Sequence, residues 1–577
     1  MPVPLARRTI PHLTRPEPAP PARSAPAPGP RWGRSAWVAV AVVALLYLLL
    51  RVLAWRAALL VEDHGSISQL FHAKVFLTFD LRQIVALEPD TTPFYPLSVA
   101  IFSLPGWSLE TAARLCSLGF SVGLFFAVVK IGQRVAGPWA TAAGLLLLSL
   151  NPILVRLSPA ILTEPSYIAT VYLGLWLFWS QYDRPTLGKA AALGLVFGLA
   201  FLNRVEGLLF LAAIPVFQAV HYFAGRPRAY GGRHLAGWVL AYVACFVLLA
   251  APQVGWASWR MGRPAINGRQ VWEEVEVKVH EDQPYQRLVY GLDYSPSVVN
   301  ITYLQAHPEA MTTHRAAPQA PLLLRYGRLV VANLRDLAKN KLQILLGFFA
   351  CVLFVVGLVV LTVRGQRADA LLVIGFLGVA LAGPLLHNVV VRHIIVVAPL
   401  MLLVAGIGVV ALAERLTSGL GGRQAVVAFV ALVLLLPAGL WAPALRRALR
   451  RDACNAEYCP ATMDRVSRIV RASARGLGRP PRVSARKQYL AYYSGGTIIA
   501  LPYTDYDGLV PYLRANSVDY LFLEDWQIRS YPFLATFSER APTDFTLLDR
   551  ETDPKGRTSA LYRVNPPRSG ADGLPPQ

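Results

Sequence analysis

The feature that most constrains this chain is a series of long apolar runs that recur from residue 36 to about residue 442. The runs have about 17–25 residues, the length a helix needs to cross ~30 Å of hydrocarbon at ~1.5 Å per residue. Charged residues make up only 16% of the 577 residues, which is less than a soluble protein of this length carries. The sequence therefore predicts a polytopic α-helical membrane protein.

We expect about eleven spans. The apolar stretches at 138–180 and 188–223 are too long for one crossing. Each is divided by a polar segment, RLSPAILTEP in the first and NRVE in the second, so each is interpreted as two spans. The expected spans are residues 36–60, 111–130, 138–157, 165–180, 188–203, 207–223, 235–256, 344–363, 370–386, 394–412 and 424–442.

The net charge of +22 indicates membrane topology and contact with lipid headgroups, and not nucleic acid. No zinc-finger spacing and no basic stripe interleaved with aromatic residues is present. Basic residues fill the short loops near 130, 184, 226, 364 and 415, which the positive-inside rule assigns to the cytoplasm together with the N-terminus. The basic segment RRALRR at 446–451 falls on the other side and disagrees with that rule. The expected location is a bacterial inner membrane.

Composition divides the chain into four regions. Residues 1–35 are rich in Pro, Ala and Arg and are expected to be a disordered basic tail. Residues 36–445 form the membrane core, with outer loops at 61–110 and 257–343; amphipathic helices lying on the membrane are expected in the second loop. Residues 446–565 alternate strand-like and helix-like runs, which predicts a small α/β domain on the outer, periplasmic face. Residues 566–577 are a second disordered tail.

Cysteines leave one question open. Cys454 and Cys459 lie outside the apolar runs and could form a disulfide if they face an oxidising compartment. The sequence does not decide whether they pair.

Four polar motifs fall on the outer side by this topology: EDH at 62–64, TEP at 163–165, NRVE at 203–206 and HNVVVRH at 387–393. They are far apart in the sequence but at one depth in the membrane. Acids near a bilayer are costly unless they are used. The pattern predicts one polar site just under the outer surface.

Acids and arginines at one interface suit sugar transfer from a lipid phosphate. A carboxylate can take the proton of an acceptor hydroxyl as that hydroxyl attacks the anomeric carbon. Arginine suits the phosphate of the leaving group because its planar fork binds two oxygens. A second acid could position the base, bind the acceptor or hold a divalent metal ion such as Mg²⁺ or Mn²⁺.

The order of short motifs resembles the GT-C membrane glycosyltransferases, in the branch of protein O-mannosyltransferases and lipid A aminoarabinose transferases. An acidic pair follows the first span, and TPFYPL follows in the same loop. SLNPILVRLSPAILTEP, FLNRVEGLLFL and VVRHIIVVAPL come later in that order, over residues 36 to about 420. The tail, with YLAYYSGG and VDYLFLED, resembles the outer α/β domain of some bacterial members.

This resemblance implies an inverting transferase that uses a polyprenyl-phosphate sugar donor, with a lipid, a glycan or a protein as acceptor. It implies that Asp63 or Glu62 is the general base, and Asp63 is favoured. Glu164 matches the second acidic position of the family. Arg392 matches a position that meets donor phosphate, and Arg204 one near the donor. Further supporting candidates are His64, Tyr95, Glu206, His387 and His393.

Structural interpretations remain beside these roles. The acidic pair could be a solvated helix end, Glu164 a first-turn acid, and Arg392 an interfacial anchor. Arg204 and Glu206 could simply pair with each other. Two other functions also remain: a transporter or flippase of lipid-linked sugars, and a non-catalytic subunit of envelope assembly. A transporter should hold its polar groups near the bilayer midplane, whereas here they gather at one interface.

Overall fold

The structure is a computed structural model that describes residues 32–566 with gaps. Several expectations fall on the gaps and so lie outside the described residues: both tails almost entirely, Glu62, Asp63, His387, Cys454, Cys459, most of the span at 424–442 and most of the loop at 257–343. The gaps are 59–63, 86, 88–90, 225–229, 268–321, 387–388, 419–438, 440, 451–459, 503–505, 531–533, 535–542 and 555.

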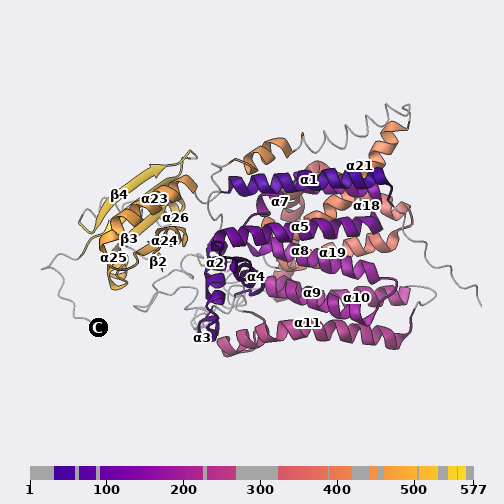
Figure 1. The fold of residues 1–577 in the computed structure, drawn as a ribbon, viewed down its shortest axis with the longest axis horizontal. Coiled ribbons are helices and arrows are strands. Elements are labelled where there is room, and N and C mark those ends of the chain that lie inside the picture. Colours follow the sequence, from indigo (N-terminus) through magenta and orange to yellow (C-terminus); the bar gives the residue numbers. More distant parts are fainter. Residues whose placement is uncertain are drawn as a thin grey trace, which may run out of the picture.

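The main body is a bundle of helices that run roughly parallel to one another (Figure 1). Within the described residues, each expected span from 36 to 412 is mainly helical. The bundle helices are α1 (Arg34–Ala57), α5 (Leu109–Val135), α6 (Pro138–Leu150), α7 (Pro152–Leu157), α8 (Thr163–Gln181), α9 (Leu187–Asn203), α10 (Leu209–Ala224), α11 (Gly232–Met261), α18 (Phe348–Val363), α19 (Arg367–Leu386) and α21 (Ala398–Thr417).

Fewer helices than expected are long and apolar enough to cross a membrane. Among the described residues there are six, or seven if the bent pair 326–346 and 348–363 is one span, so the expected number of about eleven is not confirmed. One reason is Asn151, whose side chain accepts hydrogen bonds from the backbone N–H groups of Ile153 and Leu154. This cap starts α7 and leaves α6 with only 13 residues.

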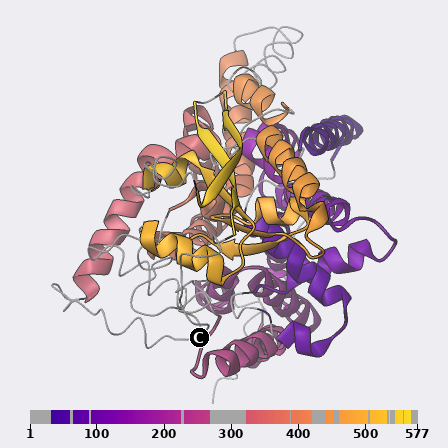
Figure 2. The same cartoon turned by 90° about the vertical axis from the view of Figure 1, so that its left-hand side faces the viewer.

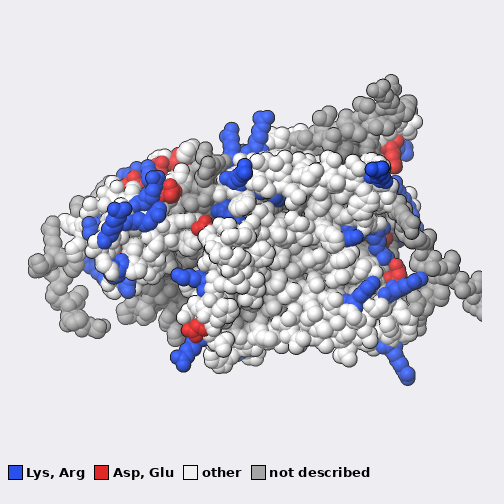
Figure 3. All heavy atoms as spheres, viewed as in Figure 1, with Lys and Arg blue, Asp and Glu red and all other residues white. Residues whose placement is uncertain are grey.

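The lateral surface of the bundle suits a bilayer. Figure 3 shows a broad band without Lys, Arg, Asp or Glu, with charged side chains at the two ends. In the centre, the first half of α21 and the turn before it are buried without a break, from residue 394 to residue 410. Gly406 lies against the backbone of α6, and Gly408 against Leu353 of α18. A side chain at either glycine would push these helices apart, so small residues permit the close packing.

Three short helices follow α1: α2 (His64–Leu77), α3 (Leu81–Val85) and α4 (Phe94–Ser103). They lie at the end of the bundle where α1 ends and where α5 and α8 begin (Figure 1). We call this the site end. The helix after residue 440 also reaches it, because Leu445 and Leu449 pack beside Leu50 of α1.

The C-terminal residues form a mixed five-stranded sheet in the order β2-β1-β3-β5-β4. β1 pairs in parallel with β2 and β3, while β5 is antiparallel to β3 and β4. The strands are β1 (Arg482–Ala485), β2 (Thr497–Ala500), β3 (Tyr520–Glu524), β4 (Phe545–Thr552) and β5 (Thr558–Val564). The helices are α23 (Pro460–Ser473), α24 (Tyr489–Ser494), α25 (Tyr506–Ala515) and α26 (Asp525–Ser530).

This C-terminal unit packs on the site end, and it faces the viewer in Figure 2. One apolar cluster joins the two parts: Leu70 and Cys116 of the bundle share it with Val466 and Tyr489. The Glu110 carboxylate in the first turn of α5 also lies within electrostatic reach of Tyr492. The unit is therefore held against the helices that surround the polar motifs.

Candidate active site at one end of the bundle

The path of the chain brings the polar motifs to one end of the bundle. α8 begins at the site end, α9 returns to it, and α19 returns to it again before α21 starts there (Figure 1). The segments 163–165, 203–206 and 389–393 therefore all lie at the site end, together with α2 and α4. Of the four motifs, the structure shows direct side-chain contact between TEP and NRVE.

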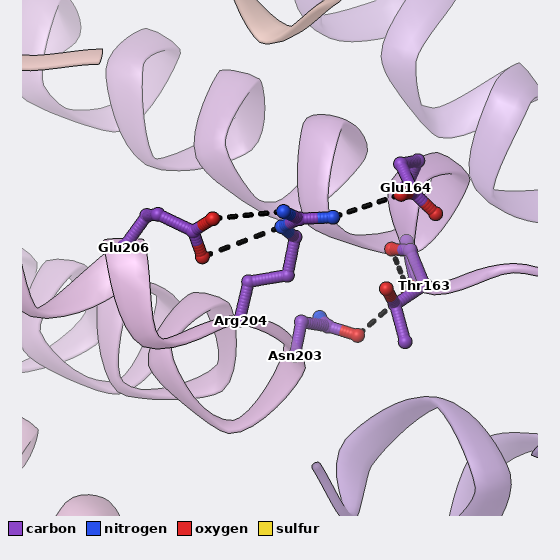
Figure 4. Close-up of polar contacts among 6 residues, drawn as sticks. Thr163, Glu164, Asn203, Arg204 and Glu206 are labelled. Carbon is purple, nitrogen blue, oxygen red and sulfur yellow. Dashed lines mark hydrogen bonds and ion pairs between the residues drawn. The ribbon is translucent and has the colours of Figure 1, made fainter. Parts of the chain in front are cut away.

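That contact is a buried ion triad centred on Arg204 (Figure 4). Its Nη1 atom lies 2.8 Å from Oε1 of Glu164, and its Nη2 atom lies 2.8 Å from Oε1 of Glu206. Nε also donates to Oε2 of Glu206 at 3.4 Å. The side chains of Arg204 and Glu164 are each only 5% exposed, and that of Glu206 is 19% exposed.

Local sequence explains why these three side chains meet. Glu164 stands in the first turn of α8, where a negative charge is favourable. Pro165 is tolerated in the same turn because a backbone N–H, which proline lacks, would have no partner within the helix there. Arg204 is an extended residue between α9 and the 3₁₀ turn η1 (Val205–Leu208), which also carries Glu206. Gly207 lies directly against the backbone of Ala200 and Phe201, so the turn is tight.

Neighbouring polar groups hold the two segments together. Ser166 donates to Oδ1 of Asn203 at 2.6 Å and to the carbonyl of Thr163 at 2.9 Å. The ring of Tyr167 lies 5.8 Å from the Arg204 guanidinium carbon. The triad is thus supported on both sides by neighbours that are close in the sequence to Glu164 and Arg204.

The charge of the triad does not cancel. One guanidinium faces two carboxylates, so the ionised group carries one surplus negative charge in a buried setting. Such a charge is expensive unless another group uses it. Oε1 of Glu164 accepts a hydrogen bond from Arg204, whereas Oε2 accepts none from the described residues, so Oε2 can accept from a donor group of a substrate.

Tyr95 belongs to a second polar chain beside the triad. Its hydroxyl contacts Ser117 Oγ at 2.8 Å and donates to the Ala113 carbonyl at 3.2 Å, while Ser117 donates to the Ala160 carbonyl at 2.7 Å. Both Glu164 and Arg114 are close enough to act on Tyr95 electrostatically.

Arg114 was missed by the sequence interpretation. It is buried in α5, and its Nη1 donates to the carbonyl of Ala58 at 2.7 Å, five residues before Asp63. The available signal was an arginine inside the apolar run TAARLCSLGF.

The other expected site residues are placed less fully. Glu62, Asp63 and His387 lie outside the described residues, and of His64 only the backbone, at the start of α2, is described. Arg392 is exposed and His393 half-buried, both on the short helix α20 (Val391–Ile394). Their neighbour Ile394 is buried in the bundle core, which anchors this segment at the site end.

Metal binding finds no support in the triad as it stands. No group of three His, Cys, Asp or Glu side chains able to hold a metal ion occurs within the described part of the chain. Glu164 and Glu206 are bridged by Arg204, so a cation between them would have to displace the guanidinium.

No protein-family model and no curated protein matches the sequence. Solved structures do match. The oligosaccharyltransferase of Archaeoglobus fulgidus, solved with a tethered acceptor peptide, superposes with a TM-score of 0.53 at 11% identity over 91% of this chain and 74% of that chain. ArnT from Cupriavidus metallidurans in the apo state gives 0.53 at 14% identity, over 91% of this chain and 98% of ArnT.

ArnT bound to undecaprenyl phosphate gives a TM-score of 0.50 at 12% identity, over 92% of this chain and 98% of that chain. These neighbours are GT-C glycosyltransferases. The chain therefore has the GT-C fold, and the fold predicted from the motif order is confirmed. With this fold and its apolar spans, it is an integral membrane protein.

Proposed function

We propose that this protein is an inverting glycosyltransferase that moves a sugar from a polyprenyl-phosphate donor to an acceptor hydroxyl. The buried triad of Glu164, Arg204 and Glu206, with its surplus negative charge at the site end, carries the proposal. The fold supports it, because ArnT has the same fold and has been solved with undecaprenyl phosphate bound.

The reaction needs a base, and we assign it to the first-loop acids, with Asp63 preferred over Glu62. The acceptor oxygen bonds to the anomeric carbon while the bond from that carbon to the phosphate oxygen breaks. The polyprenyl phosphate leaves with the electron pair, and the hydroxyl proton passes to the carboxylate. The described residues support this assignment: Arg114 donates to the carbonyl of Ala58, five residues before Asp63, and both Arg114 and Glu164 act on Tyr95 electrostatically.

The triad geometry indicates different roles for Arg204 and Arg392. Both Nη atoms of Arg204 are engaged by carboxylates, so Arg204 orients Glu164 near the donor. Glu164 then positions the acceptor, whose hydroxyl groups can donate to its remaining oxygen. Arg392, exposed at the site end, is the residue we assign to the donor phosphate.

We further propose that the site end and the C-terminal unit lie on the outer, periplasmic face of a bacterial inner membrane. The basic pairs Lys130 with Arg134, and Arg364 with Arg367, support this because they lie toward the opposite end, which would then be cytoplasmic. The acceptor class, whether lipid, glycan or protein, stays open. The packed C-terminal unit would lie where an acceptor approaches from outside the membrane.

Transfer of radiolabelled sugar from polyprenyl-phosphate donors tests the proposal. We expect Asp63→Asn, or else Glu62→Gln, to lose roughly 10²–10⁴-fold in rate. Glu414→Gln is the matched control, because Glu414 is 61% exposed at the far end of α21 and pairs only loosely with Arg364 at 3.6 Å.

Equal transfer by both first-loop variants and the wild type would refute the assignment of the base. If no donor is used while labelled lipid-linked sugar still crosses the membrane, the protein is a transporter instead. A chain that supports neither process would be a non-catalytic subunit.

A further inference from the structure

The helix that leads into α18 changes direction sharply. α16 (Leu322–Asp336) continues through the π-helical turn η2 (Leu337–Lys341) into α17 (Leu342–Leu346). Gly347, with φ +79°, then breaks the helix, and the two sides meet at 102°. In Figure 2, which looks along the bundle, this helix (pink) runs across the view at the side of the bundle.

This direction puts α16 in the plane of the membrane. α18 packs along the central span, with Gly357 against the backbone of Val404 and Leu353 against Gly408. A helix nearly perpendicular to that packed pair runs parallel to the bilayer surface. Since α18 begins at the site end, α16 lies at that surface.

Three contacts fix α16 and α17 to the bundle. Leu337 is 5% exposed and belongs to the main core. The Asn333 side chain donates to the carbonyl of Leu385 at the end of α19, at 2.9 Å. Asn151 donates to the carbonyl of Leu345 at 2.8 Å. The helix therefore has one anchored face and one outward face.

The outward face combines apolar and cationic side chains in one stripe. Leu324, Arg328, Val331, Arg335 and Lys339 follow at steps of three and four residues, which places them on one side of a helix. All five are exposed, Val331 at 66%, and they line one open groove along the helix.

The described residues offer no carboxylate partner to the cations of this stripe. Within the described part of the chain, Arg328, Arg335 and Lys339 make no ion pair. Asp336 also lines the groove, but its carboxylate accepts from Asn340 at 2.7 Å and lies 3.4 Å from Lys341. A groove at the membrane surface with surplus positive charge and exposed apolar side chains fits a lipid with an anionic headgroup.

We infer that the stripe on α16 is a binding site for an anionic bilayer phospholipid. Arg328 and Arg335 hold the headgroup phosphate, Lys339 adds charge, and the acyl chains lie along Leu324 and Val331. The site anchors the helix in the headgroup layer. It does not depend on the proposed transferase function.

Native mass spectrometry of the delipidated full-length protein, titrated with phosphatidylglycerol or phosphatidylcholine, tests this inference. The wild type should bind phosphatidylglycerol in preference to phosphatidylcholine. Arg328→Gln/Arg335→Gln should weaken phosphatidylglycerol binding roughly 10- to 30-fold, since each basic residue near an anionic lipid contributes about a factor of five.

Two control variants keep the test specific. Arg471→Gln/Arg475→Gln removes two exposed charges from the C-terminal unit and should leave lipid binding unchanged. Arg328→Lys/Arg335→Lys keeps the charge and should retain most of the preference, while an unchanged circular dichroism spectrum checks folding. The inference fails if the wild type does not prefer phosphatidylglycerol or if the glutamine variant binds it equally well. It also fails if undecaprenyl phosphate, and not phosphatidylglycerol, occupies the site.

Discussion

Arg51 and Arg204 are both buried arginines at the site end, and the protein satisfies them in different ways. Arg51, 2% exposed, donates to the carbonyls of Ser149 at 2.6 Å and Leu148 at 3.1 Å, at the C-terminal end of α6. Its guanidinium carbon lies 3.6 Å from the centre of the Tyr47 ring. Arg204 instead faces two carboxylates, Glu164 and Glu206.

We propose that this difference distinguishes a structural charge, that of Arg51, from a functional one, that of Arg204. The last carbonyls of a helix have no partners within the helix and carry partial negative charge, so Arg51 completes α6 without adding a second ionised group. The Arg204 group keeps a surplus negative charge in a buried position. We therefore assign packing to Arg51 and the organisation of the active site to Arg204.

Replacing Arg51 or Arg204 by methionine should lower the free energy of unfolding by different amounts. Arg204→Met leaves two buried carboxylates without their counter-charge and should cost about 3–5 kcal/mol of stability. Arg51→Met leaves only carbonyls unsatisfied and should cost about 1–3 kcal/mol. Unfolding in detergent, followed by circular dichroism, measures both. An Arg51→Met loss as large as that of Arg204→Met would contradict the distinction.

His72 in α2 is a third buried basic side chain, and unlike the two arginines it can be neutral. It is 5% exposed, and its Nε2 lies 3.3 Å from Thr91 Oγ1. Burial lowers the pKa of His72 to about 4, so the folded protein keeps it neutral. Between pH 6.5 and 4 the unfolded chain binds a proton that the folded chain does not, and stability falls as the pH falls.

The expected loss over that interval is roughly 2–3 kcal/mol. The measurement is thermal unfolding at pH 7 and pH 4 for the wild type and for His72→Gln, which has no proton to gain at this position. The wild type should lose more stability on acidification than the variant. Equal losses would show that other groups account for the pH dependence.

The smallest effect is expected at Tyr47. Tyr47→Phe keeps the ring beside Arg51 and removes only the hydrogen bond from the hydroxyl to the Ser121 carbonyl, 2.8 Å long. The cost should be about 0.5–1.5 kcal/mol by the same unfolding measurement. A loss close to that of Arg51→Met would mean that the hydroxyl, and not the ring, supports the arginine.

The resemblance of the motif order to the GT-C glycosyltransferases predicted the fold that the solved structures share. Separately, the alternation of spans predicted that distant polar segments lie at one end. The same topology placed TEP and NRVE at one depth, and Glu164 and Arg204 meet there from 40 residues apart. The pairing of Arg204 with Glu206 was also open from the sequence, since they are only two residues apart. The structure contains both contacts at once.

Other features could not be predicted from the sequence. Arg51 lies inside the expected first span, 36–60, and only the approach of the end of α6 explains its burial. Span lengths depend on caps such as Asn151, which divide an apolar run that has no Gly or charge at the break. The stripe on α16 can be assigned to the bilayer surface only once the 102° turn at Gly347 is known.

The most direct test of the central claim compares Glu164→Gln with Arg51→Met in transfer of radiolabelled sugar from an undecaprenyl-phosphate donor, at matched amounts of folded protein. Glu164→Gln removes the surplus charge but keeps the shape of the triad, and misplacement of the reacting groups should lower transfer on the order of 10²-fold. Arg51→Met should transfer like the wild type. Full activity in Glu164→Gln, or a comparable loss in Arg51→Met, would contradict the account.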